Sequence, residues 1–170
     1  MPGAGCRAPP ASRRVVDEAC APRGPTASRP QGRGSAAERG GRFVHRVLEA
    51  IPYAQFLGVQ VEPAGDSWRC VLPFRQEIIG NPRLPAIHGG VLGAFLELTA
   101  FLRLYAEAAG ERAPKPINFS ADYLRSAGPQ TTYAEAIIFK LGRRIATVHV
   151  VAWQDDRNKP VASGNGKFRL

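Results

Sequence analysis

The sequence predicts an α+β domain in which an antiparallel sheet of five to six strands wraps around one long central helix. In residues 91–102, Glu97 is the only ionisable side chain, so this helix is expected to be apolar on all faces and buried. The stretch over 67–74 alternates with period two, as strands do, and four further strands are expected after the helix. Only strands in this chain are apolar enough to cover the helix, which gives one helical layer on one sheet.

The elements before the helix follow from apolar spacing and from turn residues. Apolar residues recur at helical spacing over 43–51, and Pro52 ends that short helix. A turn over 53–57 leads into a strand at 58–63, and Gly65 with Asp66 forms a hairpin turn to a strand at 67–74. Residues 75–87 are expected to form a loop.

The second half of the chain is predicted to be the helix and four strands. The helix spans about 90–109, since Gly110 ends it and Pro114 and Pro116 prevent its resumption. The strands are expected near 117–124, 131–140, 143–154 and 160–169, separated by turn-forming residues.

Composition limits the classes of function. Residues 1–41 are rich in Gly, Pro, Ala and Arg and are predicted to be a disordered basic tail, while residues 42–170 form the domain. The tail holds +4 and the domain +5 of the net charge of +9, which suits an anionic small ligand and not a nucleic acid. No uninterrupted apolar run approaches the roughly 18 residues of a membrane span. Three cysteines without a CxxC pair indicate a reducing, cytoplasmic location without disulfides or a metal site.

His88, Gly89 and Gly90 directly precede the apolar helix that carries Glu97. The glycines either open the backbone N–H groups of the first helical turn to a substrate, or allow tight packing of the helix on the sheet. An unpaired carboxylate in such a helix is costly and is a candidate for chemistry. Alternatively, Glu97 is a structural acid paired with a buried Arg or Tyr.

The His88-Gly89-Gly90 motif with the acid nine residues after the histidine resembles the hotdog-fold acyl-CoA thioesterases. The branch it is most similar to contains the phenylacetyl-CoA (PaaI-type) and hydroxybenzoyl-CoA thioesterases. Residues 117–125, 142–146 and 161–164 also match, so the resemblance covers about residues 43–170. It implies the hotdog fold, acyl-CoA substrates, no separate cofactor, and a homodimer or homotetramer with active sites at subunit interfaces. It further implies that Asn81 orients the thioester or the water.

For each of the remaining candidate site residues, more than one role is open. Glu97 could act on the thioester as a general base or as a nucleophile. His88 could orient the loop or act as an acid or base, and Thr99 could reach the site or bond back to its own helix. Four basic residues could bind the CoA phosphates or be solvated strand charges. They are Arg125, Lys140, Arg143 and Arg144.

Helix geometry makes a dimer a mechanistic prediction. Gly90 and Glu97 lie on one helix face but about 10 Å apart along the axis, too far to act on one bond. Two helices packed antiparallel about a two-fold axis would place Glu97 of one chain beside Gly90 of the other. Alternative functions are a hotdog enoyl-CoA hydratase or dehydratase, and a non-catalytic acyl-CoA-binding hotdog protein.

Overall fold

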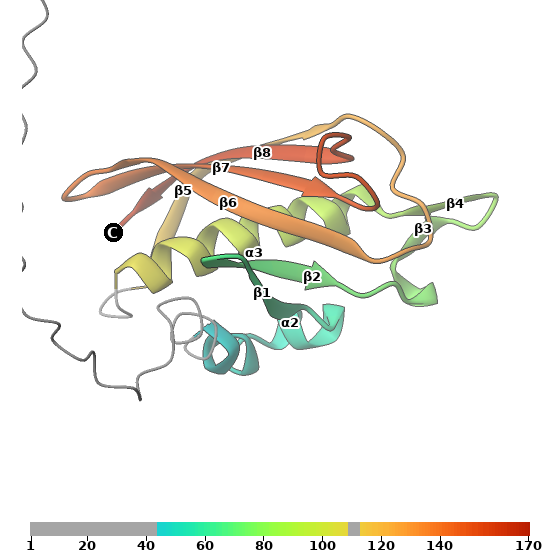
Figure 1. The fold of residues 1–170 in the computed structure, drawn as a ribbon, viewed down its shortest axis with the longest axis horizontal. Coiled ribbons are helices and arrows are strands. Elements are labelled where there is room, and N and C mark those ends of the chain that lie inside the picture. Colours follow the sequence, from blue (N-terminus) through green and yellow to red (C-terminus); the bar gives the residue numbers. More distant parts are fainter. Residues whose placement is uncertain (1–43, 109–112) are drawn as a thin grey trace, which may run out of the picture. The chain divides into compact units, whose positions relative to one another are not determined.

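The computed structural model describes residues 44–108 and 113–170, which belong to one compact unit. Within these ranges, six strands form an antiparallel sheet in the order β1-β2-β6-β7-β8-β5. The strands are β1 (Gln60–Ala64), β2 (Ser67–Leu72), β5 (Lys115–Tyr123), β6 (Thr132–Leu141), β7 (Ile145–Trp153) and β8 (Ala162–Arg169). The long helix α3 (Gly89–Glu107) lies across one face of the sheet (Figure 1). The predicted fold class is confirmed, and the predicted disordered tail lies outside the described residues.

Proline and glycine set the boundaries of the elements before α3. Residues 44–49 are helical, and helix α2 (Pro52–Leu57) begins with the proline that ends the preceding helix. Gly58 ends α2 with a φ of 68°, and Gly65 makes the β1–β2 turn with a φ of 59°. Both are left-handed conformations that glycine adopts without steric cost.

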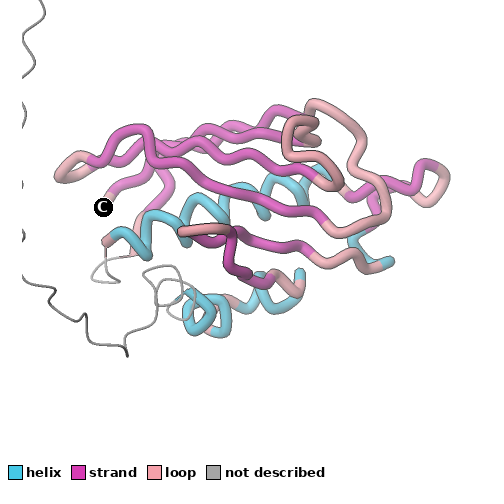
Figure 2. Tube along the Cα trace, viewed as in Figure 1, coloured by secondary structure: helices cyan, strands magenta, loops and turns pink. Residues whose placement is uncertain are grey.

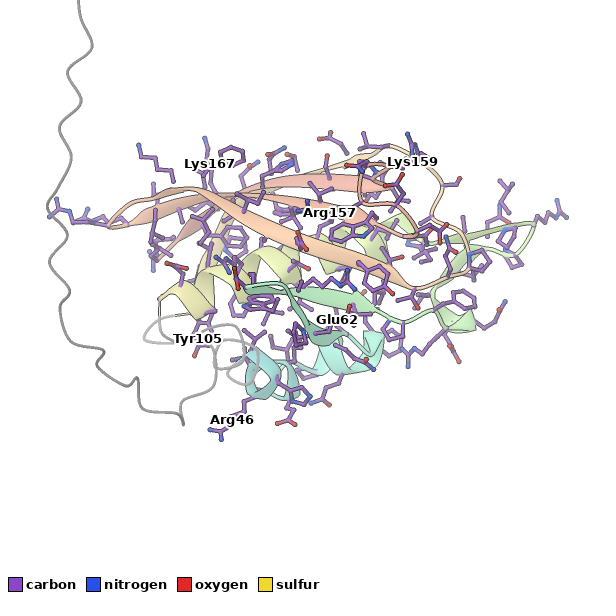
Figure 3. All side chains as sticks on the ribbon, viewed as in Figure 1. Arg46, Glu62, Tyr105, Arg157, Lys159 and Lys167 are labelled. Carbon is purple, nitrogen blue, oxygen red and sulfur yellow. The ribbon has the colours of Figure 1, made fainter. Side chains whose placement is uncertain are left out.

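Small inward-facing side chains let the strands approach α3 closely. On β7 and β8, alternate residues are buried, and most of them are Ala, Val or Gly. They face α3 residues that include Phe95 and Leu96, both fully buried. Lys167 of β8 lies on the opposite face of the sheet and points away from the helix (Figure 3). The helix therefore fills the inside of the curved sheet (Figure 2).

The prediction of a loop over residues 75–87 is wrong. This segment contains a short 3-10 helix (Gln76–Ile78) and a two-stranded hairpin of β3 (Ile79–Asn81) and β4 (Leu84–Ile87). The hairpin extends beyond the start of α3 (Figure 1). Its strands are only three and four residues long, and Pro85 lies within the second, so no period-two pattern marks them in the sequence.

β5 begins earlier than predicted and includes Pro116. A proline removes a donor from a strand, but β5 is an edge strand and has a register shift between Pro116 and Asn118. Edge positions and bulges are the places where a sheet tolerates proline.

The prediction that α3 is buried on all faces is also wrong. Leu92, Phe95, Leu96 and Thr99 are buried against the sheet, whereas Ala94, Glu97, Leu98 and Phe101 are only half-buried. By length and composition alone, α3 could span a membrane, yet it is the central helix of this domain. One largely apolar face of α3 is thus incompletely covered within a single chain.

Gly166 provides a test of the packing between β5, β8 and α3. A Cβ at this position would lie 2.6 Å from the Phe168 ring and 2.7 Å from the Phe119 ring. We expect Gly166→Ala to lower the free energy of unfolding by about 1–3 kcal/mol, because a close-packed core accommodates added atoms only through strain. Urea denaturation measures this loss.

Gly128→Ala is the matched control, since the added Cβ would meet nothing closer than 3.9 Å. We expect it to change stability little. Equal stability of the two variants would contradict the packing argument.

Candidate active site

The start of α3 is capped by the side chain of His88. The Gly90 N–H donates to His88 Nδ1 at 3.0 Å, and the Val91 N–H donates to the His88 carbonyl at 2.9 Å. A neutral His88 with Nδ1 as acceptor carries its proton on Nε2. This hydrogen bond is the one expected if His88 orients the turn, and it already engages the Gly90 amide. A Cβ on Gly90 would lie 3.0 Å from His88 Nδ1. A residue larger than glycine at position 90 would therefore crowd the capping imidazole.

Gly89 carries the free amide of the first helical turn. Within the part of the chain that the structure describes, its N–H has no hydrogen-bond acceptor. Gly89 lines a cavity of about 410 Å³ together with Tyr123 and Arg125. A helix N-terminus with a free N–H and a neighbouring guanidinium favours negative charge. Of the two predicted glycines, Gly89 is therefore the one whose N–H can polarise a carbonyl.

Tyr123, at the end of β5, holds this first turn in place. Its hydroxyl donates to the Gly89 carbonyl at 2.7 Å. A Cβ on Gly93 would lie 3.0 Å from the same hydroxyl oxygen, so the glycine one turn into α3 leaves room for it. The sequence contained a signal for this contact, namely a glycine inside an otherwise strong helix, but not the identity of the residue that needs the space.

Glu97 lies in the middle of α3 and faces a second cavity, of about 330 Å³. It is half-buried and has no hydrogen bond or ion pair with any described residue, so the structure does not place it as a buried acid with an Arg or Tyr partner. The other lining residues are Ile51, Tyr53, Ala94, Leu98, Phe101, Pro116 and Phe168. The carboxylate is the only charged group among the lining residues.

The two cavities lie at opposite ends of β5. Gly89 and Glu97 are eight residues apart on one helix, which is about 12 Å along the axis. Pro116 at the start of β5 lines the Glu97 cavity, and Tyr123 at its end lines the Gly89 cavity. A single protomer therefore holds the two chemical groups apart.

Two of the predicted site residues lie away from both cavities. Thr99 is fully buried, and its Oγ1 donates to the Phe95 carbonyl at 2.8 Å, so it bonds back to its own helix. Asn81 is exposed in the β3–β4 hairpin, where its Oδ1 accepts the Arg83 N–H at 2.9 Å.

The predicted basic residues fall into two groups. Arg125 lines the Gly89 cavity. Lys140, Arg143 and Arg144 are exposed at the β6–β7 hairpin, near the C-terminal end of α3. Leu141 of that hairpin shares a cavity with Arg103, which lies about 21 Å along α3 from Gly89. Within one protomer, the three basic side chains of the β6–β7 hairpin therefore lie far from Gly89.

Neither the one described cysteine nor a metal cluster offers a second chemistry within the described residues. Burial raises the pKa of the Cys70 thiol to about 12, although a hydrogen bond with Thr99 acts in the opposite direction. Cys70 is therefore a protonated core residue at neutral pH. No group of three or more His, Cys, Asp or Glu side chains within the described ranges could hold a metal ion.

Comparison with known proteins agrees with the fold. The thioesterase superfamily profile matches residues 84–161, from β4 to the turn before β8. A crystal structure from Chromobacterium violaceum is 37% identical, with a TM-score of 0.63 and coverage of 78% of this chain and 96% of that chain. No curated protein matches the chain significantly.

Two more distant crystal structures share the fold. A thioesterase-like, phenylacetic acid degradation-related protein from Ralstonia eutropha is 21% identical, with a TM-score of 0.64 and coverage of 75% and 99% of the two chains. A Bacillus halodurans protein crystallised with CoA is 17% identical, with a TM-score of 0.62 and coverage of 78% and 89%. The chain belongs to the thioesterase superfamily, and its domain has the hotdog fold.

Proposed function

We propose that this protein hydrolyses acyl-CoA thioesters in a two-fold dimer, in which Gly89 of one protomer and the partner subunit's Glu97 act on the same thioester. The observation that carries the proposal is the Gly89 N–H at the helix start and the Glu97 carboxylate in a separate apolar cavity, neither of which has a partner among the described residues. Membership of the thioesterase superfamily supports the reaction class, and the CoA-containing neighbour of the same fold supports CoA as the thiol portion.

The edge strand β5 supports this arrangement of the dimer. Within the described residues, β5 pairs only with β8, so one edge of a nine-residue strand is open. An open edge of this length is a template for pairing, and self-pairing about a two-fold axis is antiparallel. If the axis passes between Phe119 and Ser120, Pro116 lies opposite Tyr123 of the partner subunit. The Glu97 cavity of one protomer then adjoins the Gly89 cavity of the other.

The chemistry needs a donor for the oxyanion and a group that activates the attack. The Gly89 N–H stabilises the negative charge that develops on the thioester oxygen. In one route, Glu97 takes a proton from a water whose oxygen attacks the carbonyl carbon. In the other, Glu97 attacks the thioester carbon first and forms a mixed anhydride, which water then cleaves at the Glu97 carboxyl carbon so that the water oxygen enters Glu97. In both, the carbon–sulfur bond breaks, and the free acid and CoA leave. A single turnover in ¹⁸O-labelled water, followed by analysis of Glu97 for the label, distinguishes the routes.

The basic residues are proposed to bind the CoA portion. Arg125 stands beside Gly89 in the same cavity. Because the two α3 helices are antiparallel in the proposed dimer, the partner's β6–β7 hairpin lies toward the Gly89 end. Lys140, Arg143 and Arg144 would then face the CoA phosphates from the second chain, which Arg binds through two donors at once.

The direct test is Glu97→Gln, which keeps the size of the side chain and removes its charge. We expect kcat for a panel of acyl-CoAs to fall by about 10²–10⁴-fold, with a smaller change in KM. Release of CoA thiol is the measurement.

Glu107→Gln is the matched control, since Glu107 lies on the same helix outside both cavities. We expect it to keep wild-type kcat. Thiol release by Glu97→Gln within a few-fold of wild type would contradict the proposed role. Addition of water to an enoyl-CoA without thiol release would favour a hydratase instead.

A further inference from the structure

The cavity beside Glu97 determines which acyl groups the proposed thioesterase can accept. We propose that it binds the acyl group of the substrate, that this group must be uncharged and apolar, and that Phe101 limits its length. The inference rests on the proposed function and adds the substrate class and a specificity-determining residue to it.

The lining of the cavity sets the polarity of its ligand. Seven of its eight residues are apolar or aromatic, and Glu97 is the only ionisable group apart from the Tyr53 hydroxyl. No cation lines it. A second carboxylate on the acyl group would therefore lose its hydration without gaining a partner and would be repelled by Glu97. The cavity thus selects against dicarboxylic acyl groups.

The position of the cavity matches that of an acyl group whose thioester is at Glu97. Ala94, Leu98 and Phe101 lie on successive turns of one face of α3, on either side of the carboxylate. Phe168, which is fully buried, and Pro116 close the sheet side, while Ile51 and Tyr53 close the side of the N-terminal helices. The cavity therefore lies along this face of the helix, and its volume of about 330 Å³ can hold an acyl chain or a ring.

Phe101 lines this cavity on the side of Glu97 that lies toward the end of α3. It lies one turn after Glu97, about 6 Å further along the helix axis. Its ring stacks on that of Tyr105 on the next turn, with ring centroids 5.6 Å apart and planes 10° apart. We therefore expect the stacked pair to limit the cavity toward the end of α3, so that an acyl chain that passes Phe101 has to displace an aromatic ring.

The first experiment compares hexanoyl-CoA with adipoyl-CoA, which has the same number of acyl carbons and a terminal carboxylate. We expect kcat/KM to be at least about 100-fold higher for hexanoyl-CoA, since the site leaves the added charge unpaired. Equal values would overturn the proposed polarity of the cavity while leaving the proposed hydrolysis intact. Hydrolysis of no acyl-CoA at all would overturn both.

The second experiment uses Phe101→Ala and a series of straight-chain acyl-CoAs. We expect the ratio of kcat/KM for dodecanoyl-CoA to that for hexanoyl-CoA to rise about tenfold, because the shortened side chain extends the cavity. Phe139→Ala is the matched control, since Phe139 is 71% exposed on β6 and lies outside the cavity. We expect it to leave the ratio unchanged.

A third variant keeps the proposal testable if Phe101→Ala does not fold. Ala94→Leu fills the cavity from the same helix face, and we expect it to lower kcat/KM for long and ring-containing acyl groups more than for acetyl-CoA. Chain-length preferences that stay the same in the folded variants would overturn the assignment of this cavity to the acyl group.

Discussion

Replacing Gly89 with proline is expected to leave the domain folded and to lower kcat for acyl-CoA hydrolysis by about 10²–10³-fold. The substitution removes the Gly89 N–H, which has no acceptor among the described residues. Proline is favoured at the first position of a helix, where its missing donor is not needed. The preceding residue, His88, has φ −59° and ψ 131°, an extended conformation that a following proline prefers.

Gly89→Ala is the control for this prediction, because it adds a side chain and keeps the N–H. Its Cβ would lie 3.5 Å from the Tyr123 ring, an ordinary contact. We expect the alanine variant to retain kcat within about tenfold, and both variants to keep the circular dichroism spectrum of the wild type. Similar losses in both variants would point to packing against Tyr123, and full activity in the proline variant would exclude the Gly89 amide from the reaction.

The sequence predicted the fold well where one element dominates its surroundings. An apolar helix with a single carboxylate, followed by alternating segments, left few ways to bury α3 other than under an antiparallel sheet. The β3–β4 hairpin escaped prediction because its short strands bury little and contain Pro85. Pro116 was read only as preventing resumption of the helix, and the strand was placed from residue 117, since sequence alone does not show that β5 lies at an edge of the sheet.

The candidate site was predicted in part, for physical reasons. A glycine-opened helix start and Glu97 could be located by spacing, but which glycine N–H is free depends on the rotamer of His88. The number of apolar neighbours around Glu97 suggested full burial, whereas one face of α3 is left half-covered by the single chain. The Tyr123 contact joins residues 34 positions apart, which no local pattern reports.

If a second chain covers the half-buried face of α3 and shares its active site, two inactive variants should complement each other. We expect that mixing two inactive variants, Gly89→Pro and Glu97→Gln, restores hydrolysis. In a mixed dimer, one site receives Gly89 from one chain and Glu97 from the other, so it is intact, while the second site carries both substitutions. If chains exchange at random in an equal mixture, half of the dimers are mixed, and activity reaches about a quarter of the wild-type value per chain.

This recovery separates a shared site from one contained in a single protomer. If Gly89 and Glu97 of the same chain acted together, every site in the mixture would carry one of the substitutions, and mixing would restore nothing. Refolding the two variants together from urea ensures exchange, and a mixture of Glu97→Gln with Glu97→Gln/Gly89→Pro is the control that must stay inactive. Recovery in the first mixture alone requires that the 12 Å between Gly89 and Glu97 along one helix is bridged by the antiparallel helix of a second chain.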